Sequence, residues 1–312
     1  MVLNSGGANA CTGAQGFADV HRTAEHVATA LGVSAADVVV CSTGLIGELL
    51  PMDRVLAGID RAAAELREDG HALAATAIRT TDTVSKEATH AGDGWSVSGM
   101  AKGAGMLAPA LATMLVVLTT DAVLAPEELD EALRAATGVT FDRIDSDGCM
   151  STNDTVVALA SGASGVPVPL DVLTRALTDV CSDLARQLVA DAEGASHDIV
   201  IEVRSAARED DALEVARAVA RNALFKCAVF GNDPNWGRVL AAVGTTRAAF
   251  DPALLDVAIN GVQVCRGGGV GEDRSLVDLR PREVTVTVDL HAGPAAATVW
   301  TNDLTHDYVH EN

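Results

Sequence analysis

The segment "MAKGAGMLAPALATMLVVLTTDA" (Met100–Ala122) passes from a basic, glycine-rich start through an apolar stretch to an acidic end. Thr113 stands in its most apolar part, directly after the small Ala112. A buried threonine is ordinary in itself, because its β-branched side chain suits a strand and its hydroxyl can bond a carbonyl. The β-branched run 114–120 that follows therefore predicts a buried strand beginning next to Thr113.

The composition predicts a folded α/β protein. With 312 residues, 48% hydrophobic and 21% charged, the chain can form one large domain or two modest ones. Aromatic residues make up only 3%, so Ala, Val and Leu must build the core. The formal net charge of −21 argues against nucleic-acid and anionic-membrane partners. Six cysteines without CxxC spacing and a start without a basic leader predict reduced thiols and a cytoplasmic location.

Helices and strands alternate along the whole chain. Helices are predicted by apolar spacing and terminal signals at 17–31, 51–66, 125–137, 170–192 and 307–312. Strands are predicted at 1–3, 38–41, 95–103, 114–120, 198–206, 227–231, 256–265 (with a hairpin turn at Asn260-Gly261) and 283–290, and a loop at Ser42–Gly44. This mixture predicts an α/β (α+β) layered sandwich with mixed and antiparallel sheets.

Thr113 becomes a plausible nucleophile if the bond before it is cut. Cleavage would free an α-amine with a pKa of about 8, and that amine can accept the proton of the threonine's own hydroxyl. Ala112 is small, so the bond is open to attack, and the glycines at 103 and 105 could hold a strained turn. The turn containing Thr43 offers a hydroxyl and backbone N–H groups for an oxyanion hole.

Seven motifs then resemble, in the same order, those of the glutamate N-acetyltransferase/ornithine acetyltransferase family, and they cover almost the whole chain. They are "LNSGGANACTG" (Leu3–Gly13), "CSTGLIG" (Cys41–Gly47), "TTDTVSK" (Thr80–Lys86), "AKGAGMLAPALATML" (Ala101–Leu115), "DSDGCMSTNDT" (Asp145–Thr155), "DAEGA" (Asp191–Ala195) and "DPNWGRV" (Asp233–Val239).

The resemblance implies a cytosolic enzyme of arginine biosynthesis with a layered α/β fold. Such an enzyme moves acetyl from N2-acetylornithine to glutamate by a ping-pong route through an acyl-enzyme, and some members also use acetyl-CoA. From the residues themselves we expect no cofactor and no metal. The resemblance also implies self-cleavage between Ala112 and Thr113, which gives pieces 1–112 and 113–312 that form one folded unit, assembled as an α2β2 heterotetramer.

The family's functional residues carry over onto matching positions of this chain. Thr113 matches the nucleophile, and Thr43 with Gly44 matches the oxyanion hole. The substrate contacts match Thr80, Lys102, Thr113, Glu193 and Asn312. A lysine suits a substrate carboxylate, and a glutamate suits an ammonium group. By sequence alone, Lys102 could equally be a solvated surface lysine and Glu193 an exposed residue at a helix end.

Two departures from the family pattern leave alternatives open. Family members usually carry several dozen residues before the first motif and a Ser/Thr-bearing tail after the position of Asn312, and this sequence contains neither. We expect their absence to affect stability and substrate affinity more than identity. The alternatives are a self-cleaving aminopeptidase or amidase that uses water as acceptor, and an inactive, truncated scaffold.

Overall fold

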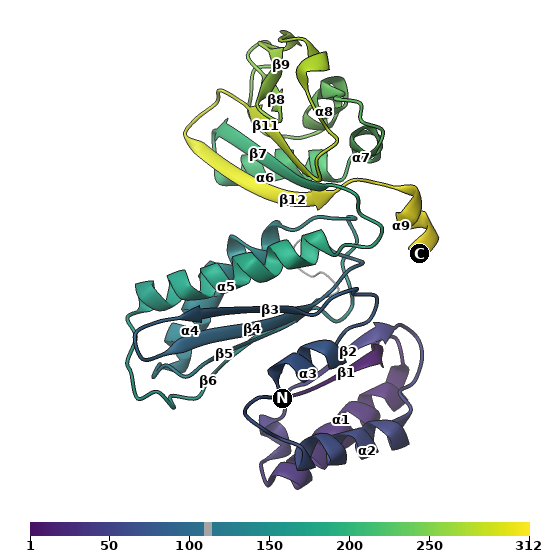
Figure 1. Ribbon diagram of the computed structural model, residues 1–312, viewed down its shortest axis with the longest axis vertical. Helices are drawn as coiled ribbons and strands as arrows, with labels where there is room; N and C mark the ends of the chain where they lie inside the picture. Colours follow the sequence, from purple (N-terminus) through teal and green to yellow (C-terminus); the bar gives the residue numbers. More distant parts are fainter. Residues whose placement is uncertain (109–113) are drawn as a thin grey trace. The chain divides into compact units, whose positions relative to one another are not determined.

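Two apolar patterns set the architecture: period two in the strands and period three to four in the helices. The computed structural model describes residues 1–108 and 114–312. These residues form two compact units, each made of sheet and helices (Figure 1). The first unit comprises residues 1–104, 114–139 and 150–188, and the second comprises residues 105–108, 140–149 and 189–312.

The first unit holds a parallel pair of strands, β1-β2, and a four-stranded sheet in the order β3-β4-β5-β6. In that sheet β5 and β6 run parallel, and the other neighbours are antiparallel. Its strands are β1 (Val2–Gly7), β2 (Val40–Leu45), β3 (Lys86–Ala91), β4 (Ser96–Lys102), β5 (Leu115–Thr120) and β6 (Thr155–Ala160). Its helices are α1 (Gly13–Leu31), α2 (Met52–Ala64), α3 (His71–Ala77), α4 (Pro126–Gly138) and α5 (Leu170–Ala190), with a 3-10 turn at Ala35–Asp37.

Helix α5 packs against the four-stranded sheet (Figure 1). Leu177, Val180 and Leu184 recur on one face of the helix and are buried. Gly99 on β4 allows this close approach, because a Cβ there would lie only 2.9 Å from a Leu184 methyl carbon. Strand β5, which begins at Leu115, therefore lies inside a sheet with a helix against it.

The second unit holds a six-stranded mixed sheet in the order β10-β9-β8-β11-β7-β12, in which β11 and β7 run parallel. Its strands are β7 (Asp198–Ala206), β8 (Asp256–Ile259), β9 (Val262–Arg266), β10 (Gly269–Val270), β11 (Glu283–Asp289) and β12 (Ala295–Asn302). Its helices are α6 (Glu209–Ala220), α7 (Ala223–Phe230), α8 (Trp236–Val243) and α9 (His306–Glu311), with 3-10 turns at Phe141–Arg143 and Arg274–Leu276.

Alternate residues of the central strands build the core of this unit. Ile199, Ile201 and Val203 of β7 are fully buried, as are Val215 and Val219 of α6, which packs on the sheet. Their side chains point to one face because a strand repeats every two residues and a helix every three to four. The layered α/β fold with mixed sheets is therefore confirmed.

Two local predictions are wrong. The predicted strand at 227–231 is instead the second half of α7, which begins where the Asn222 side chain accepts a hydrogen bond from the Phe225 N–H at 2.9 Å. The predicted loop at Ser42–Gly44 lies inside β2, because this segment pairs in register with β1. The hairpin turn is confirmed: Asn260 and Gly261 both have positive φ and join β8 to β9.

Over the part of the chain that the structure describes, every helix is too short or too polar to cross a bilayer.

Candidate active site

The predicted oxyanion residues lie at the end of a buried strand. Thr43 is only 1% exposed, and it pairs with Ser5 across the β1-β2 ladder. Gly44 follows with φ of 128°, a conformation that residues with a Cβ rarely adopt. A Cβ at Gly44 would lie 2.4 Å from the Gly6 carbonyl carbon, so the two backbones touch. The site therefore needs glycine at position 44 for space as well as for conformation.

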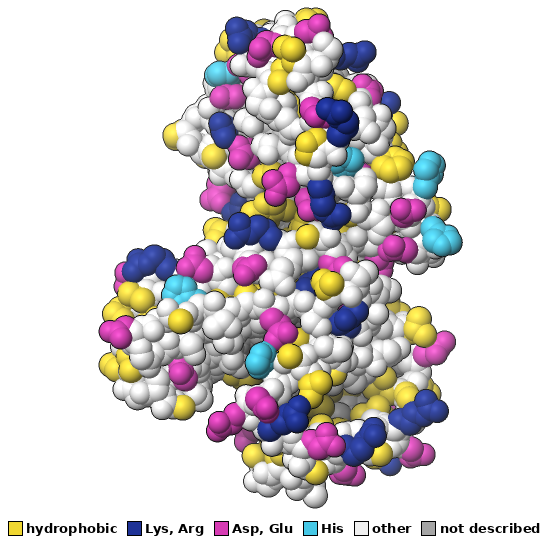
Figure 2. Space-filling view, viewed as in Figure 1, with side chains coloured by type: hydrophobic (Ala, Val, Ile, Leu, Met, Phe, Trp, Pro, Cys, Tyr) yellow, Lys and Arg dark blue, Asp and Glu magenta, His cyan; other side chains and the backbone are white. Residues whose placement is uncertain are grey.

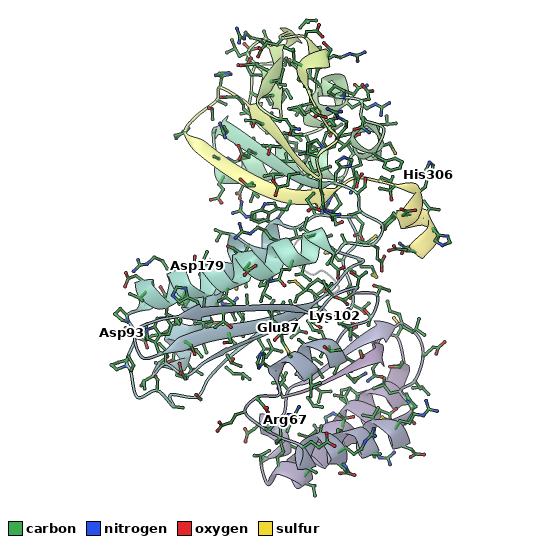
Figure 3. The ribbon with its side chains drawn as sticks, in the orientation of Figure 1. Arg67, Glu87, Asp93, Lys102, Asp179 and His306 are labelled. Carbon is green, nitrogen blue, oxygen red and sulfur yellow. The ribbon has the colours of Figure 1, made fainter. Side chains whose placement is uncertain are left out.

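Lys102 and Thr43 are brought together in the first unit. Lys102 ends β4 and is 1% exposed (Figure 3), so it is not the solvated lysine that the sequence alone allowed. Its Nζ donates to Thr43 Oγ1 at 3.2 Å. An ammonium group has donors only, so the Thr43 hydroxyl must accept here and keeps its own proton for another acceptor. This arrangement turns a threonine hydroxyl into an oriented hydrogen-bond donor.

Asp82 organises the backbone around this pair. Its carboxylate accepts from Lys86 Nζ at 2.7 Å, from the Gly103 N–H at 2.6 Å and from the Thr80 N–H at 3.1 Å. Burial alone would raise the pKa of Asp82, but the hydrogen bonds from Lys86 and Gly103 hold it below its ordinary value. Asp82 therefore ties Thr80, a predicted substrate contact, to the residue that follows Lys102.

Thr113 and Ala112 lie outside the described residues, so their predicted roles remain predictions. On the N-terminal side, in the second unit, the Met106 N–H donates to Asp147 Oδ2 at 2.7 Å. On the C-terminal side, in the first unit, the Met114 N–H donates to Asp154 Oδ1 at 2.8 Å. Both acceptors come from the motif Asp145–Thr155, which thus holds the chain before and after residues 109–113.

Asp154 is a carboxyl group in a desolvated place. Burial raises its pKa to about 7, although hydrogen bonds from the Met114 and Ser151 N–H groups and the charge of Lys102 act in the opposite direction. Its neighbour Asn153 donates through Nδ2 to the Ala8 and Ser42 carbonyls, at 2.5 and 3.1 Å. Two adjacent residues before β6 therefore contact the residue before β5, the residue after β1 and a residue of β2.

Glu193 and Asn312 are brought together in the second unit. Asn312 Nδ2 donates to Glu193 Oε2 at 3.0 Å. Gly105 lies under this carboxylate, because a Cβ there would come within 2.4 Å of Glu193 Oε2. Gly194 allows α9 to dock beside Glu193, since its own Cβ would collide with the Tyr308 backbone nitrogen. The second glycine of the Gly103–Gly105 motif is thus explained by close packing.

A cavity of about 330 Å³ adjoins Glu193 in the second unit. Its charged lining includes the carboxylates of Glu193 and Asp147 and the cations of Arg221 and Lys226. Burial lowers the pKa of Lys226 to about 8. Such mixed charge suits a small zwitterion better than a polyanion. On the face drawn in Figure 2, acidic and basic side chains are interspersed rather than gathered into one patch.

The predicted site residues therefore fall into two groups. Thr43, Gly44, Thr80 and Lys102 belong to the first unit, and Glu193 and Asn312 belong to the second. Sequence analysis missed Asp82, Asn153 and Asp154 as site residues, although all three stand inside the quoted motifs. The signal available for Asp82 was its spacing of four residues from Lys86.

Layered mixed sheets and a buried lysine that orients a threonine hydroxyl beside a glycine with positive φ define a class: α/β enzymes equipped for acyl chemistry. A family model described as the ArgJ family matches residues 1–312, and the chain belongs to this family. It is an acyltransferase of arginine biosynthesis, and autocatalytic processing is characteristic of its family.

The relatives in the first two comparisons match the full length of this chain. The "Arginine biosynthesis bifunctional protein ArgJ" of Thermobifida fusca is 68% identical over 100% of this chain and 82% of that protein. The protein of the same name from Streptomyces coelicolor is 65% identical with the same coverage. A crystal structure of arginine biosynthesis bifunctional protein argJ from Bacillus halodurans superposes with a TM-score of 0.59 at 34% identity, covering 62% of this chain and 96% of that chain.

Proposed function

We propose that this chain is a glutamate N-acetyltransferase that moves acetyl from N2-acetyl-L-ornithine to L-glutamate through an acyl-enzyme on Thr113. The Thr43 hydroxyl, oriented by Lys102 at 3.2 Å and followed by the backbone of Gly44, is the observation that carries the proposal. A buried, oriented donor of this kind stabilises the negative charge that develops on a carbonyl oxygen during acyl transfer. Membership of the ArgJ family supports the same chemistry.

Maturation comes first. The Thr113 hydroxyl attacks the Ala112 carbonyl carbon, the C–N bond breaks, and an ester replaces the peptide bond. Water hydrolyses this ester, which leaves a carboxylate on Ala112 and a free α-amine on Thr113. The products are pieces 1–112 and 113–312, which stay folded together, and we propose an α2β2 assembly of them.

Transfer then takes two steps. The Thr113 α-amine accepts the proton of the hydroxyl, Oγ attacks the acetyl carbonyl, and the amide bond to ornithine breaks as the departing amine takes up that proton. The oxygen that becomes negative faces Thr43 and Gly44. The glutamate amine next attacks the ester, its proton passes back to Thr113 Oγ, and N-acetylglutamate leaves.

Charged and polar side chains would hold the two amino acids. Lys102 suits their α-carboxylate, and Glu193 suits an ammonium group, with Thr80 and Asn312 as hydrogen-bonding partners. The mixed charge of the cavity beside Glu193 supports amino-acid substrates. Acidic and basic side chains are mixed over the face drawn in Figure 2. We therefore expect individual cations, rather than a basic surface, to attract the carboxylates of a small substrate.

The test follows both products with purified protein. N2-acetylornithine and glutamate should give ornithine and N-acetylglutamate in equal amounts, and denaturing mass measurement should find a piece that starts at Thr113. Thr113→Ala should leave the chain whole and abolish transfer, whereas Thr119→Ala, an exposed threonine of the same segment, should do neither. Full transfer by Thr113→Ala defeats the proposal.

The same assay separates the finer alternatives. Release of acetate that does not depend on glutamate indicates a hydrolase of the amidase or aminopeptidase kind. Formation of N-acetylglutamate from acetyl-CoA and glutamate tests the second donor. An uncut chain without either activity indicates an inactive scaffold.

A further inference from the structure

Asn153 holds the peptide that leads into the oxyanion residues. An asparagine amide nitrogen carries two hydrogens, and Asn153 uses them on the Ala8 carbonyl at 2.5 Å and the Ser42 carbonyl at 3.1 Å. The Ser42 carbonyl belongs to the peptide bond that joins Ser42 to Thr43. The orientation of this peptide sets where the Thr43 residue lies within β2.

Asp154 holds the peptide that follows the predicted nucleophile. Its Oδ1 accepts from the Met114 N–H at 2.8 Å, and its Oδ2 is fixed by the Ser151 N–H at 3.2 Å. The Met114 nitrogen forms the peptide bond with Thr113. The residue after Asp154 starts β6, which pairs in parallel with β5 from Leu115 onward. The carboxylate thus extends the sheet contact by one residue toward Thr113.

We propose that Asn153 and Asp154 form a positioning pair that sets the spacing between the oxyanion residues Thr43 and Gly44 and the peptide that follows Thr113. Asn153 and Asp154 are consecutive residues. A shift of the peptide that one of them holds must therefore also move the peptide that the other holds. This inference rests on the proposed role of Thr113. Neither side chain is assigned a contact with substrate, so both act through their neighbours.

Spacing of this kind matters more for rate than for affinity. An acyl carbonyl must lie within reach of the nucleophile and of the oxyanion donors at once, and a misplacement of about 1 Å can cost about 100-fold in rate. Such a shift has less effect on substrate affinity, because other residues hold the rest of the substrate. The pair should therefore affect kcat and self-cleavage more than KM.

The experiment compares five variants of the full chain, one of which combines the two alanine substitutions of the pair. Asp154→Ala and Asn153→Ala remove the hydrogen bonds, whereas Asp154→Asn keeps an oxygen acceptor for the Met114 N–H and loses the charge. Asp121→Ala is the matched control, because this carboxylate follows the opposite end of β5 and accepts from the Ser96 N–H at 2.7 Å. The readouts are kcat and KM for both substrates, the rate of appearance of the 113–312 piece, and the melting temperature.

We expect each alanine variant of the pair to lower kcat by about 10- to 100-fold with KM within about 3-fold, and to slow self-cleavage. Asp154→Asn should recover most of that loss, and Asp121→Ala should keep kcat within about 2-fold. The double alanine variant should lose little more than the single ones, because both act on one spacing. If Asp154→Ala does not fold, the kcat and the self-cleavage rate of Asn153→Ala and Asp154→Asn still test the proposal.

The inference is overturned if the alanine variants keep wild-type kcat, or if Asp154→Asn loses as much as Asp154→Ala. It is also overturned if Asp121→Ala, at an equal loss of melting temperature, loses as much kcat as the variants of the pair. The proposed function fails separately, when Thr113→Ala still transfers acetyl. Normal variants of the pair together with an inactive Thr113→Ala would remove the positioning role alone.

Discussion

The Lys102 ammonium donates to the Thr43 hydroxyl at 3.2 Å in a place where both side chains are 1% exposed. Water does not compete for this bond, and the lysine cannot accept one in return. The threonine is thereby fixed as a donor toward whatever lies on its other side. A hydroxyl that is free to rotate in solvent would have to be reoriented for each reaction, which a preorganised donor avoids.

Removing the Thr43 hydroxyl should therefore lower the rate. Thr43→Val keeps the shape of the side chain, and we expect it to reduce kcat for acetyl transfer by about 100-fold, the usual loss for one oxyanion donor. Thr43→Ser retains the hydroxyl and should stay within about 10-fold of wild type. Steady-state kinetics with N2-acetylornithine and glutamate measure both. A Thr43→Val enzyme with wild-type kcat would exclude this donor from the mechanism.

Gly44 should tolerate no side chain. Gly44→Ala places a Cβ 2.4 Å from the Gly6 carbonyl carbon at a backbone φ of 128°, so β1 and β2 must separate. We expect a loss of about 2–4 kcal/mol in the free energy of unfolding from this overlap and the strained φ, measured by urea titration. Gly58→Ala in α2, where a Cβ meets nothing within 4 Å, should instead be neutral or slightly stabilising. Equal stability of the two variants would contradict the close backbone contact.

Local periodicity was enough to predict most elements. The alternation in 198–206 and 283–290 predicts β7 and β11 because every second side chain must enter the core. It failed at Cys227–Phe230, where a short apolar run fits a helix as well as a strand and the deciding signal was the cap at Asn222. It failed at Thr43, where small polar residues resembled a loop and pairing with β1 made a strand.

The sequence was enough to predict which residues belong to the site, but not which of them contact one another. Lys102 and Thr43 are 59 positions apart, and Asn153 and Ser42 are 111 apart, so only the tertiary fold brings them together. Asp82 illustrates the limit. A spacing of four residues is compatible with its ion pair to Lys86, but its bond to the Gly103 N–H depends on where β4 ends.

The buried pair of Asp82 and Lys86 should be essential for stability. Both side chains are fully buried, so Asp82→Ala removes a carboxylate that a buried ammonium and two backbone N–H groups contact. We expect a loss of about 3–5 kcal/mol in the free energy of unfolding. Asp130→Ala, which breaks the exposed Arg134 pair of the same i,i+4 spacing, should cost under about 1 kcal/mol. Because the pKa of Asp82 is lowered on folding, its contribution should fade as the pH falls below about 4 through the folded pKa.

The pH dependence of stability should carry a signature of Asp154. Its pKa rises from 3.8 to about 7 on folding, chiefly through burial, so the folded protein holds a proton there that the unfolded chain releases. The stability from this proton is fully present below pH about 4 and is lost as the pH rises through 7. Asp154→Asn mimics the protonated form. The melting temperature of wild type, relative to Asp154→Asn, should therefore fall between pH about 4 and about 7 and level off above it, whereas Asp121→Asn, which leaves Asp154 intact, should follow wild type. Parallel curves for wild type and Asp154→Asn across this range would show that the carboxyl does not titrate there.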